Sequence, residues 1–363
     1  MKPSKKWMVL PLIVLIAGAS LSGFYGIHSA VVDALFNGRS STYDILQEAL
    51  PYKIRKSYQD YPSLKNREEI DFKQGGDSHH AYFYEAESPK GMIVLAHGFG
   101  SLSDGQEASL ADYFLRDHWS IFQIDLTASG KDDDASSKGF VEGPGDISET
   151  IHYIESQERF AQYSDSLCLM GYSWGAYSIA ASLSEDYRFS PKAMASFSGF
   201  DSPAGEMFGL ARHYVGFLAD IVKPLFDLGM HQSRGSKSFR RAVQGINHAE
   251  NCKVMLIQGE KDETVFPDST AIWHFADEIQ NKERLTLYGD ALLPRDHTSI
   301  WYSDEAYEYY SSKALKDYQK LISDYGSEKD IPEEEIAYIK EKSSAVDEDL
   351  LQAVSMMFEL AVA

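Results

Sequence analysis

The chain has 363 residues, 44% of them hydrophobic and 25% charged, an ordinary composition for a globular protein that can bury a sizeable core. Its formal net charge is -21, with 34 Lys and Arg against 55 Asp and Glu. Because nucleic acids are bound by clustered Lys and Arg, this balance argues against a nucleic-acid partner. The two cysteines, Cys168 and Cys252, match no metal or redox spacing, and we expect no metal site and two free thiols.

The N-terminal residues have the pattern of a targeting segment. Lys2, Lys5 and Lys6 precede an apolar run over 7–19, which continues more thinly to Val32. Residues 1–32 therefore indicate a signal anchor in a membrane, with a cleaved signal peptide and secretion as the first alternative and a buried core helix as the second. The positive-inside rule places the rest of the chain outside the cytoplasm. We interpret residues 33–66 as a linker with a helical segment.

Eight short segments have the pattern of β-strands. The first two, 67–73 and 79–86, flank turn-forming residues and predict an antiparallel hairpin. The others are short apolar runs, typical of parallel strands that are covered on both faces, at 92–96, 120–124, 167–170, 193–197, 254–257 and 285–288. Helical periodicity recurs between them, for example at 147–154, 176–183 and 271–279. The alternation predicts a mostly parallel, doubly wound α/β sheet of eight strands.

Two stretches depart from this alternation. Residues 202–249 include an apolar helix-like segment over 214–228, and we interpret them as a helical lid over the carboxyl edge of the sheet, where such sheets bind ligands. An ordinary crossover with a long helix is the alternative. After residue 325 comes a charged extension, 326–363, which ends in an apolar stripe from Leu350 to Ala361. The stripe predicts a helix that docks on the main domain, with partner binding as the alternative.

The strongest local motif is Gly171-Tyr172-Ser173-Trp174-Gly175, which lies between a predicted buried strand and a predicted helix. A GxSxG sequence in this context is typical of a nucleophile elbow. The tight turn forces the serine into a strained conformation, and side chains two residues away on either side would collide. The two glycines remove that collision, so we expect Ser173 to be the nucleophile, in the turn between the strand and the helix.

A second motif, His97-Gly98-Phe99-Gly100, also follows a buried strand. Such a turn presents a backbone N–H toward the serine. The N–H groups of Phe99 and Trp174 would form an oxyanion hole, in which one donor typically contributes about 2.7 to 4 kcal/mol to transition-state stabilisation. We expect His97 to brace the loop rather than to transfer protons.

A serine hydroxyl is a weak nucleophile and needs a general base, which in turn needs an acid to orient it. Asp262 and His297 each follow a late strand, in the order Ser, Asp, His that suits this type of elbow. Asp201 is the alternative acid, and Asp296 is less suitable because it adjoins His297 in sequence. Four other histidines follow no late strand and are expected to be solvated or structural: His79, His80, His213 and His231.

The motifs HGFG, GYSWG, GEKDETV and the late DH resemble those of the α/β-hydrolase superfamily, especially bacterial relatives of monoacylglycerol lipases and serine aminopeptidases. The resemblance covers residues 67–325 and implies the α/β-hydrolase fold, an eight-stranded sheet with a helical lid, and a mechanism without cofactor or metal. Asp125 stands where these relatives carry an Asp after a strand. Their following Arg and Gly-rich turn is replaced here by residues 126–130.

The resemblance and the motifs together favour a serine hydrolase that cleaves a carboxylic ester of a small acyl substrate through an acyl-enzyme on Ser173. Aromatic residues of the elbow and the lid are the expected walls of the substrate pocket: Trp174, Phe200, Phe208 and Phe217. A peptidase, amidase or thioesterase of the same fold is the alternative. The alternative from another class is a non-catalytic binding protein that retains the fold.

Overall fold

The computed structural model describes residues 50–363, apart from 101–104, 106, 133, 135 and 290. The predicted signal anchor over 1–32 and most of the predicted linker therefore lie outside the described residues. Three short 3-10 turns, η2 (Tyr52–Ile54), η3 (Tyr58–Asp60) and η4 (Pro62–Leu64), lead into the sheet. In the part of the chain that is described, no helix has both the length and the hydropathy of a bilayer span.

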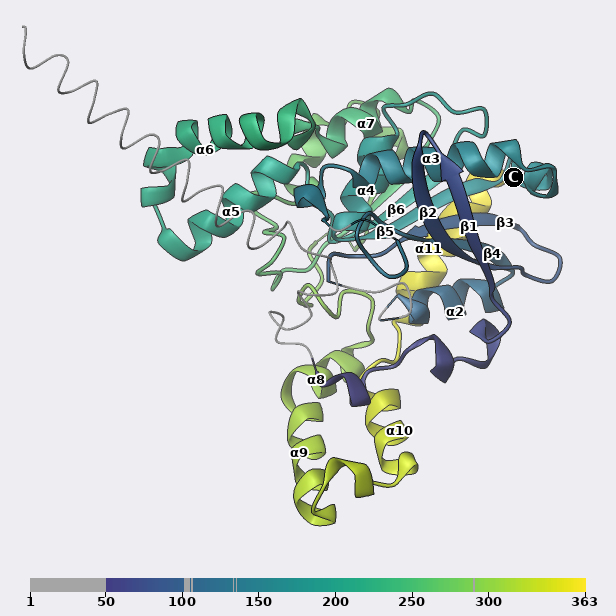
Figure 1. The fold of residues 1–363 in the computed structure, drawn as a ribbon, viewed down its shortest axis with the longest axis vertical. Coiled ribbons are helices and arrows are strands. Elements are labelled where there is room, and N and C mark those ends of the chain that lie inside the picture. The colour runs from purple at the N-terminus through teal and green to yellow at the C-terminus, as the bar shows by residue number, and fades with distance from the viewer. Residues whose placement is uncertain (1–49, 101–104, 106, 133, 135, 290) are drawn as a thin grey trace, which may run out of the picture.

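In the described residues, eight strands form a single sheet in the order β1-β2-β4-β3-β5-β6-β7-β8 (Figure 1). The strands are β1 (Glu68–Gln74), β2 (Asp77–Tyr84), β3 (Gly91–Ala96), β4 (Trp119–Asp125), β5 (Leu167–Tyr172), β6 (Ala193–Phe197), β7 (Lys253–Ile257) and β8 (Leu285–Leu287). β2 pairs antiparallel with β1 and β4, and the other neighbours are parallel. The predicted hairpin and the six predicted parallel strands are confirmed.

The apolar runs form central strands because both faces of the sheet are covered. In β3, Met92 and Val94 belong to the core on one face, whereas Ile93 and Leu95 belong to the core on the other. Successive side chains of a strand point to opposite faces, so a strand buried on both sides needs an uninterrupted apolar run. The parallel arrangement brings the carboxyl ends of β3, β5 and β7 to one edge of the sheet.

Helices form a layer on each face of the sheet. One layer contains α3 (Gly143–Ser156), α4 (Trp174–Ser182) and α7 (Ala242–His248), and the other contains α2 (Ala108–Arg116) and α11 (Glu348–Val362). The predicted helix over 271–279 is wrong in type, because this segment is a 3-10 helix, η8 (Ile272–Glu278). Its first amide donates to the carbonyl of Gly199 at 2.8 Å, which ties the segment to the loop after β6.

The C-terminal helix α11 docks on the sheet, as its apolar stripe predicts. Leu350, Val354 and Phe358 are fully buried, and the ring of Phe358 lies 5.6 Å from that of Trp119 in β4. The Trp119 Nε1–H also donates to Ser355 Oγ at 3.0 Å. Between the sheet and α11 the chain forms a separate helical lobe of α8 (Asp304–Ser312), α9 (Ala314–Tyr325) and α10 (Glu333–Lys342), which has its own small core (Figure 1).

The segment after β6 forms a helical hairpin that extends away from the sheet (Figure 1). It consists of α5 (Pro203–Val215) and α6 (Leu218–Arg234), followed by the 3-10 helix η7 (Gly235–Phe239). The expectation of one helix-like segment over 214–228 is wrong, because Gly216 adopts φ 63° and ends α5 there. The rings of Phe208 and Phe226 lie 5.6 Å apart and join the two helices.

The two cysteines lie on strands or strand ends that are not neighbours. Cys168 is in β5 and Cys252 precedes β7, with β6 between them. Both are buried, and both are free, as predicted.

Candidate active site

Ser173 lies in the turn between β5 and α4, with φ 52° and ψ -114°. This strained conformation is typical of a nucleophile elbow. The flanking glycines are required by close backbone approach: a Cβ at Gly171 would lie 2.5 Å from the carbonyl carbon of Gly175, and a Cβ at Gly175 would lie 2.2 Å from the carbonyl oxygen of Ala96. Because these contacts are with backbone, no side-chain movement could relieve them.

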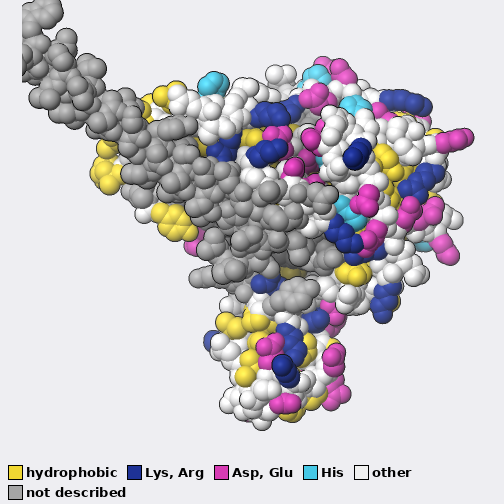
Figure 2. Space-filling model, in the orientation of Figure 1, with side chains coloured by type: hydrophobic (Ala, Val, Ile, Leu, Met, Phe, Trp, Pro, Cys, Tyr) yellow, Lys and Arg dark blue, Asp and Glu magenta, His cyan; other side chains and the backbone are white. Residues whose placement is uncertain are grey.

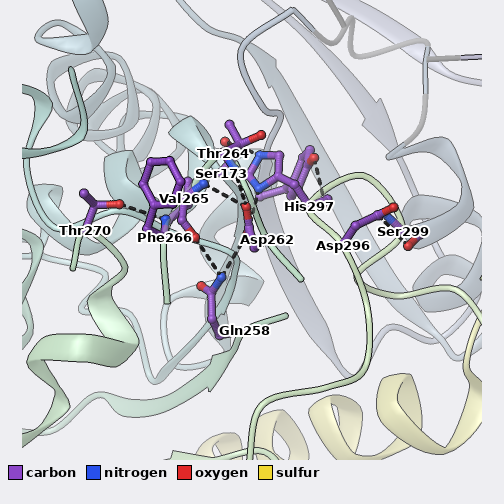
Figure 3. A network of polar contacts seen from close by, with 11 residues as sticks. Ser173, Gln258, Asp262, Thr264, Val265, Phe266, Thr270, Asp296, His297 and Ser299 are labelled. Carbon is purple, nitrogen blue, oxygen red and sulfur yellow. Dashed lines mark hydrogen bonds and ion pairs between the residues drawn. The ribbon is translucent and has the colours of Figure 1, made fainter. Parts of the chain in front are cut away.

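The structure brings Ser173, His297 and Asp262 together at the carboxyl edge of the sheet (Figure 3). His297 Nε2 lies 3.0 Å from Ser173 Oγ, and His297 Nδ1 lies 2.8 Å from Asp262 Oδ2. All three residues are at least nine-tenths buried. Both distances are within hydrogen-bond range, so the imidazole could accept the serine proton while the carboxylate holds its other nitrogen.

Asp262 is oriented by several donors besides the histidine. Its Oδ1 accepts from the amides of Thr264 at 2.9 Å and Val265 at 2.7 Å, and its Oδ2 accepts from Gln258 Nε2 at 2.9 Å. These bonds fix the position of the carboxylate. The role of Gln258 was missed in the sequence, where a polar residue directly after a buried strand is the only signal.

The two alternative acids lie elsewhere. Asp201 pairs with Arg241, and burial raises the pKa of its carboxyl. Asp296 points away from the imidazole in Figure 3 and accepts from Ser299 Oγ at 2.7 Å. Among the described contacts of His297, the only carboxylate is that of Asp262.

His97 is fully buried and braces the loop after β3. Its Nδ1–H donates to the carbonyl of Gly98 at 2.7 Å, and its Nε2 accepts from the amide of Leu126 at 3.1 Å. Both ring nitrogens are thus engaged, in a neutral tautomer, and neither is directed to Ser173. The amide of Gly98 donates to Glu107 Oε1 at 2.9 Å. Glu107, fully buried, is a second residue that the sequence did not reveal.

Phe99 and Trp174, the predicted oxyanion-hole residues, lie next to each other. Their ring centroids are 5.8 Å apart. Trp174 is the first residue of α4, where a backbone N–H has no partner within the helix and the helix dipole favours negative charge. The part that the amides of Phe99 and Trp174 play in holding an oxyanion stays a prediction.

Tyr172 supports the histidine from the elbow itself. Its hydroxyl donates to the backbone carbonyl of His297 at 3.1 Å, and the two rings lie 5.0 Å apart. The tyrosine therefore holds the loop that carries His297 against the strand that carries Ser173.

The four predicted pocket residues are not all in one place. Trp174 and Phe200 are buried and both contact Phe140, at ring distances of 5.8 and 5.4 Å. Phe208 is half-buried and lines a cavity of about 370 Å³ between the hairpin and Phe266. Phe217 is 73% exposed at the turn of the hairpin and does not line that cavity.

Glu206, near the start of α5, is a buried acid close to this cavity. Burial raises the pKa of its carboxyl well above the usual range, and the nearby negative charge of Asp262 raises it further. Its Oε2 has no hydrogen-bond partner in the described part of the protein. Within the described residues, no group of His, Cys, Asp and Glu could hold a metal ion, and the expectation of a metal-free mechanism stays a prediction.

Comparison with known proteins supports the fold. No protein-family model and no curated protein matches the chain. Among solved structures, an acylaminoacyl peptidase from Pyrococcus horikoshii is 13% identical with a TM-score of 0.50, over 71% of this chain and 41% of that chain. An esterase from Pyrococcus furiosus is 14% identical with a TM-score of 0.49, over 64% and 83%. The chain has the α/β-hydrolase fold, as its motifs predicted.

Proposed function

We propose that the protein is a serine hydrolase that cleaves a carboxylic ester through an acyl-enzyme on Ser173. The observation that carries this proposal is the continuous contact from Ser173 Oγ through the imidazole of His297 to Asp262, at 3.0 and 2.8 Å. The strained elbow at Ser173 supports it, because such strain is retained at functional sites.

The reaction proceeds in two halves. In the first, Ser173 Oγ attacks the ester carbonyl carbon while His297 Nε2 takes its proton, and the tetrahedral oxyanion accepts hydrogen bonds from the Phe99 and Trp174 amides. Collapse of this intermediate breaks the bond to the alcohol, which leaves with the proton from His297. In the second half, water repeats the sequence and releases the acid, and Ser173 regains its proton. Asp262 holds the tautomer of His297 and stabilises the imidazolium.

An ester with an apolar acyl part is the proposed substrate, because the rings of Phe140, Trp174 and Phe200 cluster beside the elbow. A peptidase, amidase or thioesterase uses the same machinery and is the alternative. A non-catalytic binding protein is the alternative from another class. It gives no reason for the strained serine within hydrogen-bond distance of an oriented histidine.

We also propose that residues 1–32 anchor the chain in a membrane, with the catalytic domain outside the cytoplasm. The lysines before the apolar run support this orientation. A phosphatase that is active only outside the cytoplasm, fused after Ala363, tests it. The fusion should be active, and an intact but inactive fusion would reverse the orientation.

A substrate panel tests the proposed reaction. The purified protein and its Ser173→Ala variant are assayed with p-nitrophenyl esters of increasing acyl length, with acyl thioesters and with aminoacyl p-nitroanilides. We expect ester hydrolysis that the variant lacks. Cleavage of the anilides alone would assign a peptidase, and cleavage of thioesters alone would assign a thioesterase. Absence of turnover on every substrate, together with no covalent labelling of Ser173 by a fluorophosphonate, would favour the alternative of a non-catalytic binding protein.

A further inference from the structure

Residues 293–303 carry His297, and we call them the His297 loop. They also contain the buried side chain of Arg295, which is 3% exposed. Charged side chains of both signs lie mixed on the visible surface of the α8–α10 lobe (Figure 2), where water weakens ion pairs. A buried guanidinium differs from them, because it stays charged and needs partners for its donors. The contacts of Arg295 therefore fix the part of the loop that carries it.

The guanidinium of Arg295 joins three segments of the chain. Its Nε–H donates to the carbonyl of Tyr302, at the end of the His297 loop, at 2.8 Å. Its Nη1 donates to the carboxylate of Asp304, the first residue of α8. Its Nη2 lies 3.5 Å from Oδ2 of Asp347, which precedes α11. One buried side chain thus connects the His297 loop to the helical lobe and to the C-terminal extension.

Asp347 connects the His297 loop to α11 in three ways. Its Oδ1 accepts from the amide of Leu350 at 3.0 Å and caps the helix, while its Oδ2 faces Arg295. Its own amide donates to the carbonyl of Trp301 at 2.9 Å. Because α11 is docked on the sheet, these contacts tie the His297 loop to a rigid element.

The backbone of Arg295 contacts the loop of the proposed catalytic acid. Its carbonyl accepts from the amide of Lys261, the neighbour of Asp262, at 3.0 Å. Gly259 allows this approach, because a Cβ there would lie 2.5 Å from the same carbonyl oxygen. Arg295 therefore contacts the loops of both Asp262 and His297 as well as the C-terminal extension.

We infer that Arg295 is a positioning residue that holds His297 against Ser173, and that the C-terminal extension takes part through Asp347. The inference rests on the proposed triad of Ser173, His297 and Asp262. The described contacts of the guanidinium lie toward α8 and α11, so Arg295 acts on the reacting atoms through the His297 loop. A displacement of about 1 Å in that loop is enough to lower the rate about 100-fold.

Two substitutions of Arg295 test its role. Arg295→Met keeps an unbranched apolar stem and removes the donors. The side chain of Asp304 is 78% exposed and Asp347 still caps α11, so neither acid becomes a buried unpaired charge and the variant should fold. Arg295→Lys keeps the charge but lacks the planar fork that reaches several partners at once.

Arg284→Met is the matched control. Arg284 is half-buried, and its Nη1 donates to the carbonyl of Cys252 at 2.6 Å. Cys252 precedes β7, whereas Asp262 follows that strand, so this arginine lies at the opposite end of β7 from the triad. A double variant, Asp304→Asn with Asp347→Asn, tests the partners, because asparagine can still cap α11 but carries no charge.

Two measurements separate positioning from general stability. Steady-state kinetics on a short ester distinguish kcat from KM. Proton NMR of the hydrogen-bonded Nδ1 proton of His297, assigned by its absence in His297→Ala, reports the position of the imidazole without catalysis. We expect Arg295→Met to lower kcat at least about 100-fold, with KM within a few-fold, and to shift or broaden this resonance.

Arg295→Lys and the double variant should lower kcat at least about 10-fold with the same spectral change, and Arg295→Lys carries the test if Arg295→Met does not fold. Arg284→Met should keep kcat and the resonance even where thermal unfolding shows lower stability.

Wild-type kcat with an unchanged resonance in a folded Arg295 variant would overturn the inference. A lower kcat with an unchanged resonance would also overturn it, because the effect would then arise away from the imidazole. If the wild type turned over no ester, the proposed function would fail, and the resonance alone would decide whether Arg295 positions His297.

Discussion

Asp262, among three acids near the carboxyl ends of late strands, is the one whose carboxylate contacts the imidazole. The bonds from Thr264 and Val265 fix its position, whereas Asp201 is engaged by Arg241.

Replacing Asp262 by Asn should lower kcat by up to about 10⁴-fold, because the unfavourable tautomer of His297 is then preferred. The matched variant Asp201→Asn should keep kcat within a few-fold and lower stability instead. Steady-state kinetics on a short ester, with thermal unfolding of both variants, measure this. Loss of turnover in Asp201→Asn alone would move the acid to Asp201.

Active-site residues could be predicted from the sequence only where the geometry or chemistry of the site allows few residue types. A glycine two positions from Ser173 is required by contacts of 2.2 to 2.5 Å with backbone, and this leaves a recognisable motif. Glu107 and Gln258 act through single hydrogen bonds to a loop amide and to Asp262. Many polar residues could make such bonds, so their sequence context does not distinguish them from ordinary surface residues.

At the scale of elements, the elbow depends on the close packing of Gly175 against β3. A Cβ at this position would meet the carbonyl oxygen of Ala96 at 2.2 Å, so Gly175→Ala must displace the start of α4 and with it Ser173. We expect a loss of stability of about 1 to 3 kcal/mol and a drop in kcat of at least about 100-fold. Gly145→Ala in α3 is the control, since no atom lies within 4 Å of its Cβ position apart from the nearby backbone of the same helix and the two neighbouring residues. This variant should be neutral or up to about 1 kcal/mol more stable.

Urea unfolding and ester kinetics on the two glycine variants check this. Equal stability and equal kcat in Gly175→Ala and Gly145→Ala would contradict the packing account of the elbow.

The sequence predicts an element where burial of one or both of its faces restricts the residue types. It does not predict features that depend on contacts with distant residues or on a local φ angle. The strands have apolar runs because both faces are covered, and α11 has an apolar stripe because one side packs on the sheet. The break at Gly216 and the 3-10 geometry of η8 depend on local φ and on a bond to Gly199, neither of which changes the hydrophobic periodicity. The α8–α10 lobe is amphipathic around a small separate core, which the charged sequence after 304 did not indicate.

At the scale of the whole molecule, the buried carboxyl of Asp146 makes stability depend on pH. The pKa of this carboxyl is raised to about 7. Burial is the largest cause. The hydrogen bonds from Thr127 and the charge of His79 lower the pKa, and the charge of Asp132 raises it. Because the unfolded pKa is about 4, the folded state binds the proton more tightly. Its contribution to stability is complete below about pH 4 and is lost as the pH rises through about 7.

Asp146→Asn removes this titration. The free energy of unfolding of the wild type should therefore fall, relative to that of the variant, between about pH 4 and 8, as followed by urea denaturation at each pH. The amide can still accept one of the bonds from Thr127, so the variant should fold. If the difference in free energy of unfolding between the wild type and Asp146→Asn stayed constant from about pH 4 to 8, Asp146 would not titrate in this range.

Covalent labelling distinguishes a nucleophilic Ser173, activated by His297 and Asp262, from an inert serine. The protein is treated with a fluorophosphonate, which phosphonylates activated serines, and the modified peptide is identified by mass spectrometry. We expect one modification, on Ser173, in the wild type and none in Ser173→Ala, with labelling slowed strongly in His297→Ala because the base is missing. A wild-type protein that is folded but unlabelled at Ser173, or a His297→Ala variant that is labelled as fast as the wild type, would overturn the assignment of the triad.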